Sequence, residues 1–123
     1  LVSDACFLSG LVKIETKSID SEVVQSPWRP KSIYHYIQWK PLNPDFVVDI
    51  SEHIDQKMES VLAYSTQFYN PNSQAPETPI SSKNFVDSVR YRAADLGRLT
   101  GVSYAEGFNV ERFPAIDSLF DLK

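Results

Sequence analysis

The most constraining feature of the sequence is a stripe of apolar residues at helical spacing that ends at a glycine. The stripe consists of Phe85, Val89, Ala93, Leu96 and Leu99. This spacing places all five side chains on one face of an α-helix. Ser81 or Ser82 can cap its beginning, and Gly101 fits the left-handed position just past a helix end. The stripe therefore predicts one long amphipathic helix.

Three segments have the composition of strands. The segment 32-SIYHYIQWK-40 is rich in β-branched and aromatic residues and is followed by prolines, which is typical of a strand that ends there. The segment 46-FVVDI-50 is almost continuously apolar, as expected of a strand buried on both faces of a parallel sheet. A third, short strand is predicted over residues 102–109.

Two further helices are predicted, over residues 1–12 and 51–66. In the second, Asp49 and Glu52 have the spacing of a capping box, and Ser51 is the alternative N-cap. The remaining segments are predicted as connections. They are the polar stretch 15–31, the proline-rich loop 69–81 and a weakly patterned terminal segment, 114–121.

The predicted order is helix, strand, strand, helix, helix, strand, which favours an α/β fold. We expect residues 1–123 to belong to one domain with three layers, in which helices flank a mainly parallel sheet. Three short strands make a thin sheet, and no capping residue precedes the helical pattern at Leu1. We therefore expect the chain to be the C-terminal portion of a larger domain, either a fragment or a proteolysed product.

Composition excludes several classes of function. The net charge of −4 and the pI near 5.1 argue against a nucleic-acid partner or an anionic membrane surface. No apolar run approaches the roughly 18 residues that a membrane span needs. The single cysteine, Cys6, cannot form an internal disulfide and fits a reducing cytoplasm. We expect Cys6 to be a small buried apolar residue.

The residues alone do not assemble a complete active site. His35 and His53 are too few for a catalytic zinc site and lack metal-ligand spacing to other residues. Arg90 and Arg98 fall on an outer helical face as solvated charges. Arg92 lies beside the apolar stripe, where a long cation usually pairs with a carboxylate. The nearest carboxylate candidate is Glu106.

Three overlapping stretches carry a resemblance to a known family. They are 45-DFVVDISEHIDQKMESVLAYSTQF-68, 66-TQFYNPNSQAPETPISSKNFVDSVRYRAADLGRL-99 and 90-RYRAADLGRLTGVSYAEGF-108. Together they resemble the C-terminal part of the LmbE-like (PIG-L superfamily) deacetylases. The resemblance implies that this chain is the C-terminal portion of a Rossmann-like α/β domain. Within that superfamily they are most similar to the bacillithiol-pathway enzymes that remove acetyl from N-acetylglucosaminyl-malate, and the second stretch resembles the Bacteroidetes version.

The resemblance implies a mechanism and partners. Family members bind a divalent metal, usually zinc, through His-Pro-Asp-Asp and His-Pro-Asp-His motifs, and neither motif occurs in this sequence. In the family, the metal activates a water, an aspartate takes its proton, and the hydroxide attacks the acetyl carbonyl. The implied partners are the N-terminal half of the same enzyme, a sugar substrate and further copies of the chain, in a hexamer. This chain is expected to be inactive alone.

The resemblance also bears on individual residues. Some family members have an oxyanion-stabilising tyrosine at the position of Phe85, which has no hydroxyl, so we expect Phe85 to pack. Gln67, Arg92, Tyr104 and Glu106 match recognisable family positions and are the predicted supporting residues near the site. For Arg92 and Glu106 we predict a pair that braces the strand over residues 102–109.

A second interpretation is also compatible with the sequence. The chain could be a self-contained, non-catalytic α/β module that binds a partner. If the deacetylase interpretation holds, the strand over residues 32–40 should have an unpaired edge, and an apolar patch should be exposed.

Overall fold

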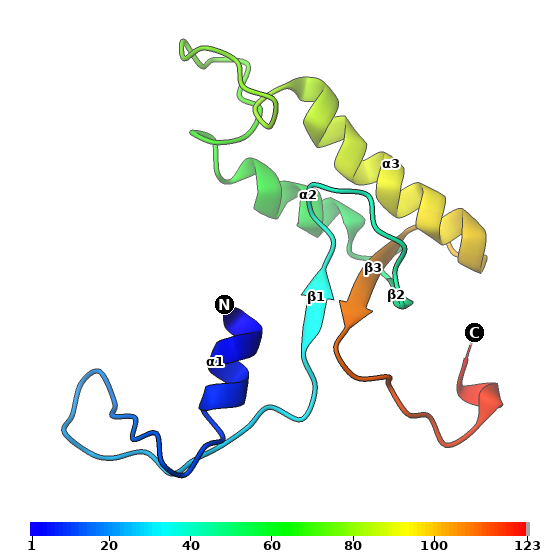
Figure 1. Ribbon diagram of the computed structural model, residues 1–123. Helices are drawn as coiled ribbons and strands as arrows, with labels where there is room; N and C mark the ends of the chain where they lie inside the picture. Colours follow the sequence, from blue (N-terminus) through cyan, green and yellow to red (C-terminus); the bar gives the residue numbers. More distant parts are fainter. Residues whose placement is uncertain (123) are drawn as a thin grey trace. The chain divides into compact units, whose positions relative to one another are not determined.

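The computed structural model describes residues 1–122 of the chain (Figure 1). The order of elements is the predicted one, with a short 3-10 turn in the terminal segment. The elements are α1 (Val2–Leu8), β1 (Tyr34–Tyr36), β2 (Phe46–Asp49), α2 (Ile54–Leu62), α3 (Lys83–Thr100), β3 (Ala105–Val110) and η1 (Leu119–Asp121). Among the described residues, no helix is long and apolar enough to cross a membrane.

The chain divides into two compact units. Unit 1 comprises Leu1–His35 with Val110–Ala115, and unit 2 comprises Tyr36–Asn109 with Ile116–Lys123. Unit 2 contains both longer helices and the β2–β3 pair, and so holds most of the regular structure.

The sheet corrects the predicted fold class. Its three strands lie in the order β1-β3-β2. β2 runs antiparallel to β3, in a register that pairs Phe46 with Phe108 and Asp49 with Ala105. The two phenylalanine rings stack, with their centroids 5.5 Å apart. The prediction of a mainly parallel, Rossmann-like sheet is therefore wrong.

The physical reason lies in the exposure of β2. Phe46 and Val47 are half-buried, whereas Val48 and Asp49 are exposed. An antiparallel strand can leave part of its surface in contact with solvent, whereas a central parallel strand is covered on both faces. The apolar run therefore does not mark a strand buried on both faces.

The long helix α3 confirms the prediction made from its stripe. The Ser82 hydroxyl oxygen accepts a hydrogen bond from the Phe85 backbone N–H (3.2 Å). At the other end, Gly101 adopts a left-handed conformation with φ 78°, which L-residues with a side chain rarely adopt.

The beginning of α2 differs from the prediction. The helix starts at Ile54, its N-cap residue is His53, and no side chain caps it. Asp49 instead accepts hydrogen bonds from both the backbone N–H (3.0 Å) and the hydroxyl (2.7 Å) of Ser51. This local turn occupies the carboxylate, so the predicted capping box with Glu52 and the predicted Ser51 N-cap are both wrong.

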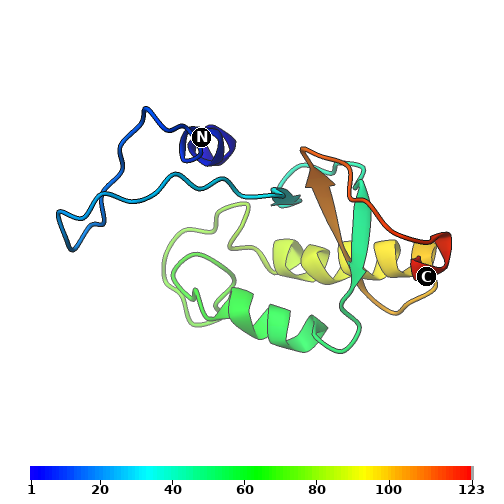
Figure 2. The ribbon, with the colours of Figure 1, turned by 90° about the horizontal axis from the view of Figure 1, so that it is seen from below.

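The core of unit 2 forms where α2, α3 and β3 meet. Ile50, Ile54 and Ala93 are buried together, and Tyr104 packs against them. Helices α2 and α3 lie side by side (Figures 1 and 2). At Gly97 the backbone of α3 comes so close to the segment leading into β3 that an added Cβ would lie 2.7 Å from the Ser103 carbonyl carbon.

Unit 1 is built around α1 and the connection that follows it. None of residues 2–8, all of which the structure describes, is buried, and Cys6 is half-buried rather than fully buried as predicted. The Arg29 guanidinium lies over the Phe7 ring, 4.5 Å from its centroid, and donates to the Phe7 carbonyl (3.1 Å). The predicted connection 15–31 contains one isolated bridge, between Lys17 and Val24.

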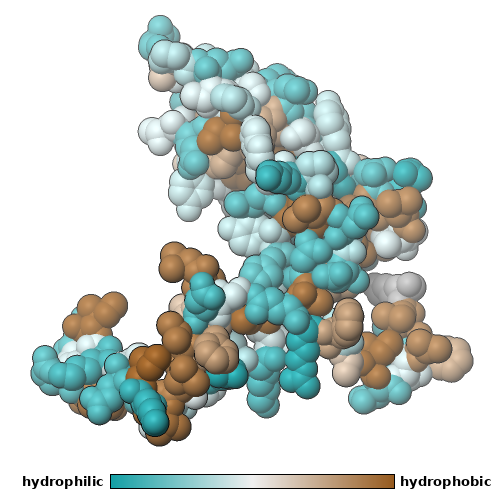
Figure 3. Space-filling model, viewed as in Figure 1, coloured by the Kyte–Doolittle hydropathy of each residue, from teal (hydrophilic) through white to brown (hydrophobic). Residues whose placement is uncertain are grey.

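Many large apolar side chains of unit 1 are exposed, and Figure 3 shows them over the N-terminal part of the chain. They include Leu1, Val2, Phe7, Leu8, Val12 and Trp28. This agrees with the predicted exposed apolar patch. β1 also lies at one edge of the strand order.

The close approach at Gly97 gives a first prediction. Alanine normally favours a helix over glycine by about 1 kcal/mol. Here its methyl group would collide with backbone atoms, and overpacking of this kind costs about 1–3 kcal/mol. We expect Gly97→Ala to lower the free energy of unfolding in urea. Arg98→Ala, at an exposed neighbour, is the control and should change it little. An unchanged or raised stability for Gly97→Ala would contradict the packing of α3 on the segment before β3.

Candidate functional site

Unit 2 contains a groove along α3, which we call the α3 groove. It consists of two hollows of about 450 and 280 Å³. The larger lies between α3, the segment 41–44 and β3, and the smaller lies beside Trp39 and Phe85. Both hollows are lined by Pro41 and Arg92, so they adjoin at these two residues.

Arg92 occupies the junction of the two hollows. It lies on the half-buried side of α3, four residues before Leu96 of the apolar stripe. Its Nη1 donates to the backbone carbonyl of Gln38. This bond holds the segment after β1 against α3, so Arg92 both shapes the groove and presents a positive charge inside it.

The carboxylate of Glu106 pairs with a different cation from the one predicted. Lys57 of α2 forms an ion pair with Glu106 of β3, and both side chains are 29% exposed. The predicted pair of Arg92 with Glu106 is therefore wrong, although both residues line the larger hollow. Lys57 is far from Glu106 in the sequence, and only the tertiary structure brings the two side chains together.

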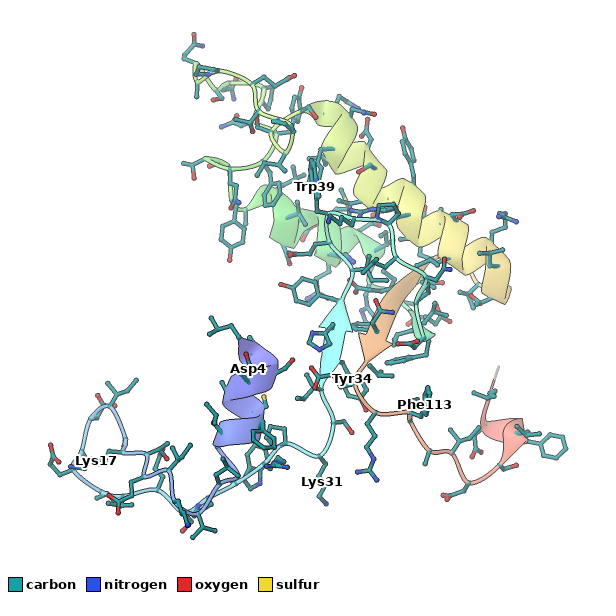
Figure 4. All side chains as sticks on the ribbon, viewed as in Figure 1. Asp4, Lys17, Lys31, Tyr34, Trp39 and Phe113 are labelled. Atoms are coloured by element: carbon teal, nitrogen blue, oxygen red, sulfur yellow. The ribbon has the colours of Figure 1, made fainter. Side chains whose placement is uncertain are left out.

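Three aromatic rings stack on one another, and two of them, Trp39 and Phe85, line the smaller hollow. Phe85 lies 6.0 Å from Trp39 and 5.9 Å from Phe68, measured between ring centroids, with interplanar angles of 24° and 12°. Figure 4 shows Trp39 beside α3. Phe85 thus packs, as its place in the apolar stripe predicted, and Trp39 and Phe68 are its partners. Sequence patterning had suggested neither partner.

The other predicted site residues lie elsewhere in unit 2. Gln67 lines a separate hollow of about 290 Å³ within residues 65–81. Tyr104 packs against the core, and the Arg90 guanidinium lies 5.9 Å from its ring centroid. The structure thus places Arg92 and Glu106 in one groove and brings neither Gln67 nor Tyr104 into it.

Arg90 is more than a solvated surface charge. It donates to Asp55 of α2 (2.7 Å). Its pKa is raised, first by the hydrogen bond to Asp55 and then by the one to Tyr104. Arg90 therefore links α3 to α2 and to the segment before β3.

Unit 1 contains a small polar cluster around Glu111. The Ser3 hydroxyl donates to the Glu111 carboxylate, and His35 Nε2 lies 2.8 Å from the same oxygen. The carboxylate stands between the hydroxyl and the imidazole, so the histidine is not placed to take a proton from the serine. Across residues 1–122, no three or more His, Cys, Asp or Glu side chains form a group that could hold a metal ion.

Comparison with known proteins shows a similarity to a solved structure. No family model matches the chain. A solved structure, the crystal structure of the conserved protein TT1542 from Thermus thermophilus, is similar with a TM-score of 0.72 and 27% sequence identity. The similarity covers 97% of this chain and 46% of that protein. The chain therefore spans about half the length of the protein it matches.

The ion pair in the groove gives a second prediction. In a double-mutant cycle with Lys57→Met and Glu106→Gln, we expect a coupling of about 0.5–1 kcal/mol, because the pair is partly exposed to solvent. The matched cycle with Arg92→Met and Glu106→Gln should give a coupling near zero. The measurement is urea unfolding of each variant. A larger coupling energy in the cycle with Arg92 than in the cycle with Lys57 would instead support the pair of Arg92 with Glu106.

The cluster around Glu111 gives a third prediction. The hydrogen bond from Ser3, followed by the one from His35, lowers the pKa of Glu111 below its ordinary 4.5. A carboxylate with a lowered pKa stabilises the fold above its unfolded pKa, and this contribution is lost as the pH falls through the folded pKa. Carboxyl NMR should therefore show Glu111 titrating below pH 4.5.

Ser3→Ala should move that titration upward. Ser9→Ala is the control, because its hydroxyl donates to the Cys6 carbonyl instead (2.9 Å). Identical Glu111 titrations in the original protein and in Ser3→Ala would show that the serine bond does not form in solution.

Proposed function

We propose that this chain is the C-terminal part of a metal-dependent N-deacetylase that hydrolyses the acetamide of an N-acetylglucosaminyl conjugate. The proposed substrate is N-acetylglucosaminyl-malate. The observation that carries the proposal is the resemblance of the stretches 45–68, 66–99 and 90–108 to this enzyme family. In the structure these stretches are neighbours that form β2, α2, α3 and β3 within unit 2.

The structural similarity supports a longer polypeptide. Nearly all of this chain, 97%, matches only 46% of the conserved Thermus thermophilus protein. A region with this fold thus occurs as part of a longer polypeptide. We propose the same arrangement here, with the N-terminal half of the enzyme as the first partner of this chain.

The exposed apolar surface of unit 1 supports the same partner. The exposed side chains of Val2, Phe7 and Leu8 all lie on α1. Large exposed apolar areas often mark an interaction site, and an exposed helix with this many apolar side chains is consistent with one. Under the proposal, the N-terminal half of the enzyme covers this surface. Further copies of the chain, in a cytoplasmic homo-oligomer, complete the proposed assembly.

The described residues do not by themselves fit the zinc ion that the family uses. His35 and Glu111 supply two candidate ligands side by side, whereas a catalytic zinc site needs about three. Under the proposal, the zinc and the catalytic aspartate belong to the other half of the enzyme. This chain then forms the walls of the substrate groove and places the positive charge of Arg92 in it.

The alternative function is a self-contained module that binds a partner without catalysis. The exposed apolar residues of α1 also fit this alternative. The two functions differ in one measurable respect. Only under the deacetylase function does the complete polypeptide hydrolyse an acetamide.

Acetate release from N-acetylglucosaminyl-malate tests the proposal. We expect the complete polypeptide of the parent gene to release acetate, to contain stoichiometric zinc, and to lose activity with a chelator and regain it with zinc. The chain of residues 1–123 should release no acetate. Zinc-dependent activity in the 123-residue chain would contradict the assignment of the zinc and the catalytic aspartate to the other half of the enzyme. A complete polypeptide that binds the sugar but releases no acetate would contradict the deacetylase function itself.

A further inference from the structure

We propose that the Trp39 end of the α3 groove binds the pyranose ring of the substrate, and that Arg92 binds an anionic substituent of that sugar. The choice of a sugar rests on the proposed function. The location rests on the aromatic stack, the hollow beside it and the position of the charge.

The aromatic stack forms a platform that is present without any ligand. Phe85 belongs to α3 and stacks with both Phe68 and Trp39. Trp39 nevertheless remains 61% exposed. A large aromatic side chain that is held in place by stacking and still faces solvent provides a ready surface for a ligand.

The hollow beside Trp39 suits the face of a sugar ring. Its volume of about 280 Å³ is lined mainly by the rings of Trp39, Phe85 and Pro41, with Ser88 and Arg92 as polar groups. The C–H groups on one face of a pyranose carry partial positive charge, and they match the negative face of an indole ring. The Ser88 hydroxyl donates to the Phe85 carbonyl (2.6 Å). Its oxygen therefore remains an acceptor for a sugar hydroxyl.

Arg92 supplies the second element of recognition. One guanidinium nitrogen, Nη1, donates to Gln38, and an arginine has five N–H donors in all. The remaining donors can bind a carboxylate in bidentate geometry. Because Arg92 lines both hollows, a sugar on Trp39 would extend its anionic substituent toward the larger hollow.

The same features disfavour other ligands that stack on aromatic rings. A quaternary ammonium would be repelled by the Arg92 charge. A nucleotide could stack and present a phosphate to Arg92. A side chain that recognises the edge of a base, however, typically offers an adjacent donor and acceptor, as an amide does. The hollow offers separate groups, the Ser88 oxygen and the Arg92 donors. The observations therefore favour an anionic sugar conjugate.

The two tryptophans of the chain allow a direct binding experiment. Trp28→Phe leaves Trp39 as the only tryptophan, and Trp39→Phe leaves Trp28 in unit 1. We would titrate both variants with methyl N-acetyl-β-glucosaminide, N-acetylglucosaminyl-malate, sorbitol and adenosine monophosphate. Tryptophan fluorescence is the measurement, and circular dichroism checks that each variant is folded.

We expect a saturable blue shift with both sugars in Trp28→Phe and none in Trp39→Phe. The neutral sugar should bind with a Kd on the order of 1 mM. The malate conjugate should bind about tenfold more tightly, and Arg92→Met in the Trp28→Phe background should remove only that extra affinity. The proposal is overturned if Trp28→Phe shows no saturable shift with the sugars, if sorbitol acts equally well, or if adenosine monophosphate binds more tightly.

Activity of the complete polypeptide separates this inference from the proposed function. Trp39→Ala should raise KM for N-acetylglucosaminyl-malate by about tenfold or more, because it removes the platform. Deacetylation with an unchanged KM in Trp39→Ala overturns the platform and leaves the proposed function standing. Sugar binding at Trp39 without deacetylation by the complete polypeptide supports the platform and overturns the proposed function.

Discussion

The packing of β3 against α3 is the interaction on which the rest of unit 2 depends. The absence of a side chain at Gly97 lets the chain before β3 lie directly on the helix. The left-handed conformation of Gly101 turns the chain back so that this contact can form. β2 then pairs with β3 in an antiparallel register. A bulkier residue at Gly97 would displace β3, and the strand paired with it would follow.

The α3 groove is a consequence of this packing. β3 carries Glu106 to the ion pair with Lys57, so one wall of the larger hollow is fixed by α2 and β3 together. The other wall is the segment after β1, which Arg92 holds through the Gln38 carbonyl. Arg92 therefore lies where the two hollows of the groove adjoin, where the proposed anionic substituent would meet its guanidinium.

The sequence predicted the features that depend on local signals. The helix ending at Gly101 and a serine cap at Ser81 or Ser82 were predictable, because each signal lies within a few residues of the structure it determines. The structure assigns the cap to Ser82. The direction of the strand at Phe46 was not predictable from its apolar run, which fits either kind of sheet. The ion pair of Lys57 with Glu106 and the stacking of Trp39 on Phe85 join residues far apart in sequence. No pattern along the chain marks such pairs.

A crystal structure of the complete polypeptide with N-acetylglucosaminyl-malate tests the central claim most directly. The claim is that this chain shapes the substrate site of an N-deacetylase whose reacting groups lie in the other half of the enzyme. The account predicts the sugar ring against the Trp39 indole, a malate carboxylate on the Arg92 guanidinium, and the acetamide directed toward a metal held by the other half. A conjugate bound away from the α3 groove, or bound with its acetamide far from any metal, would contradict it.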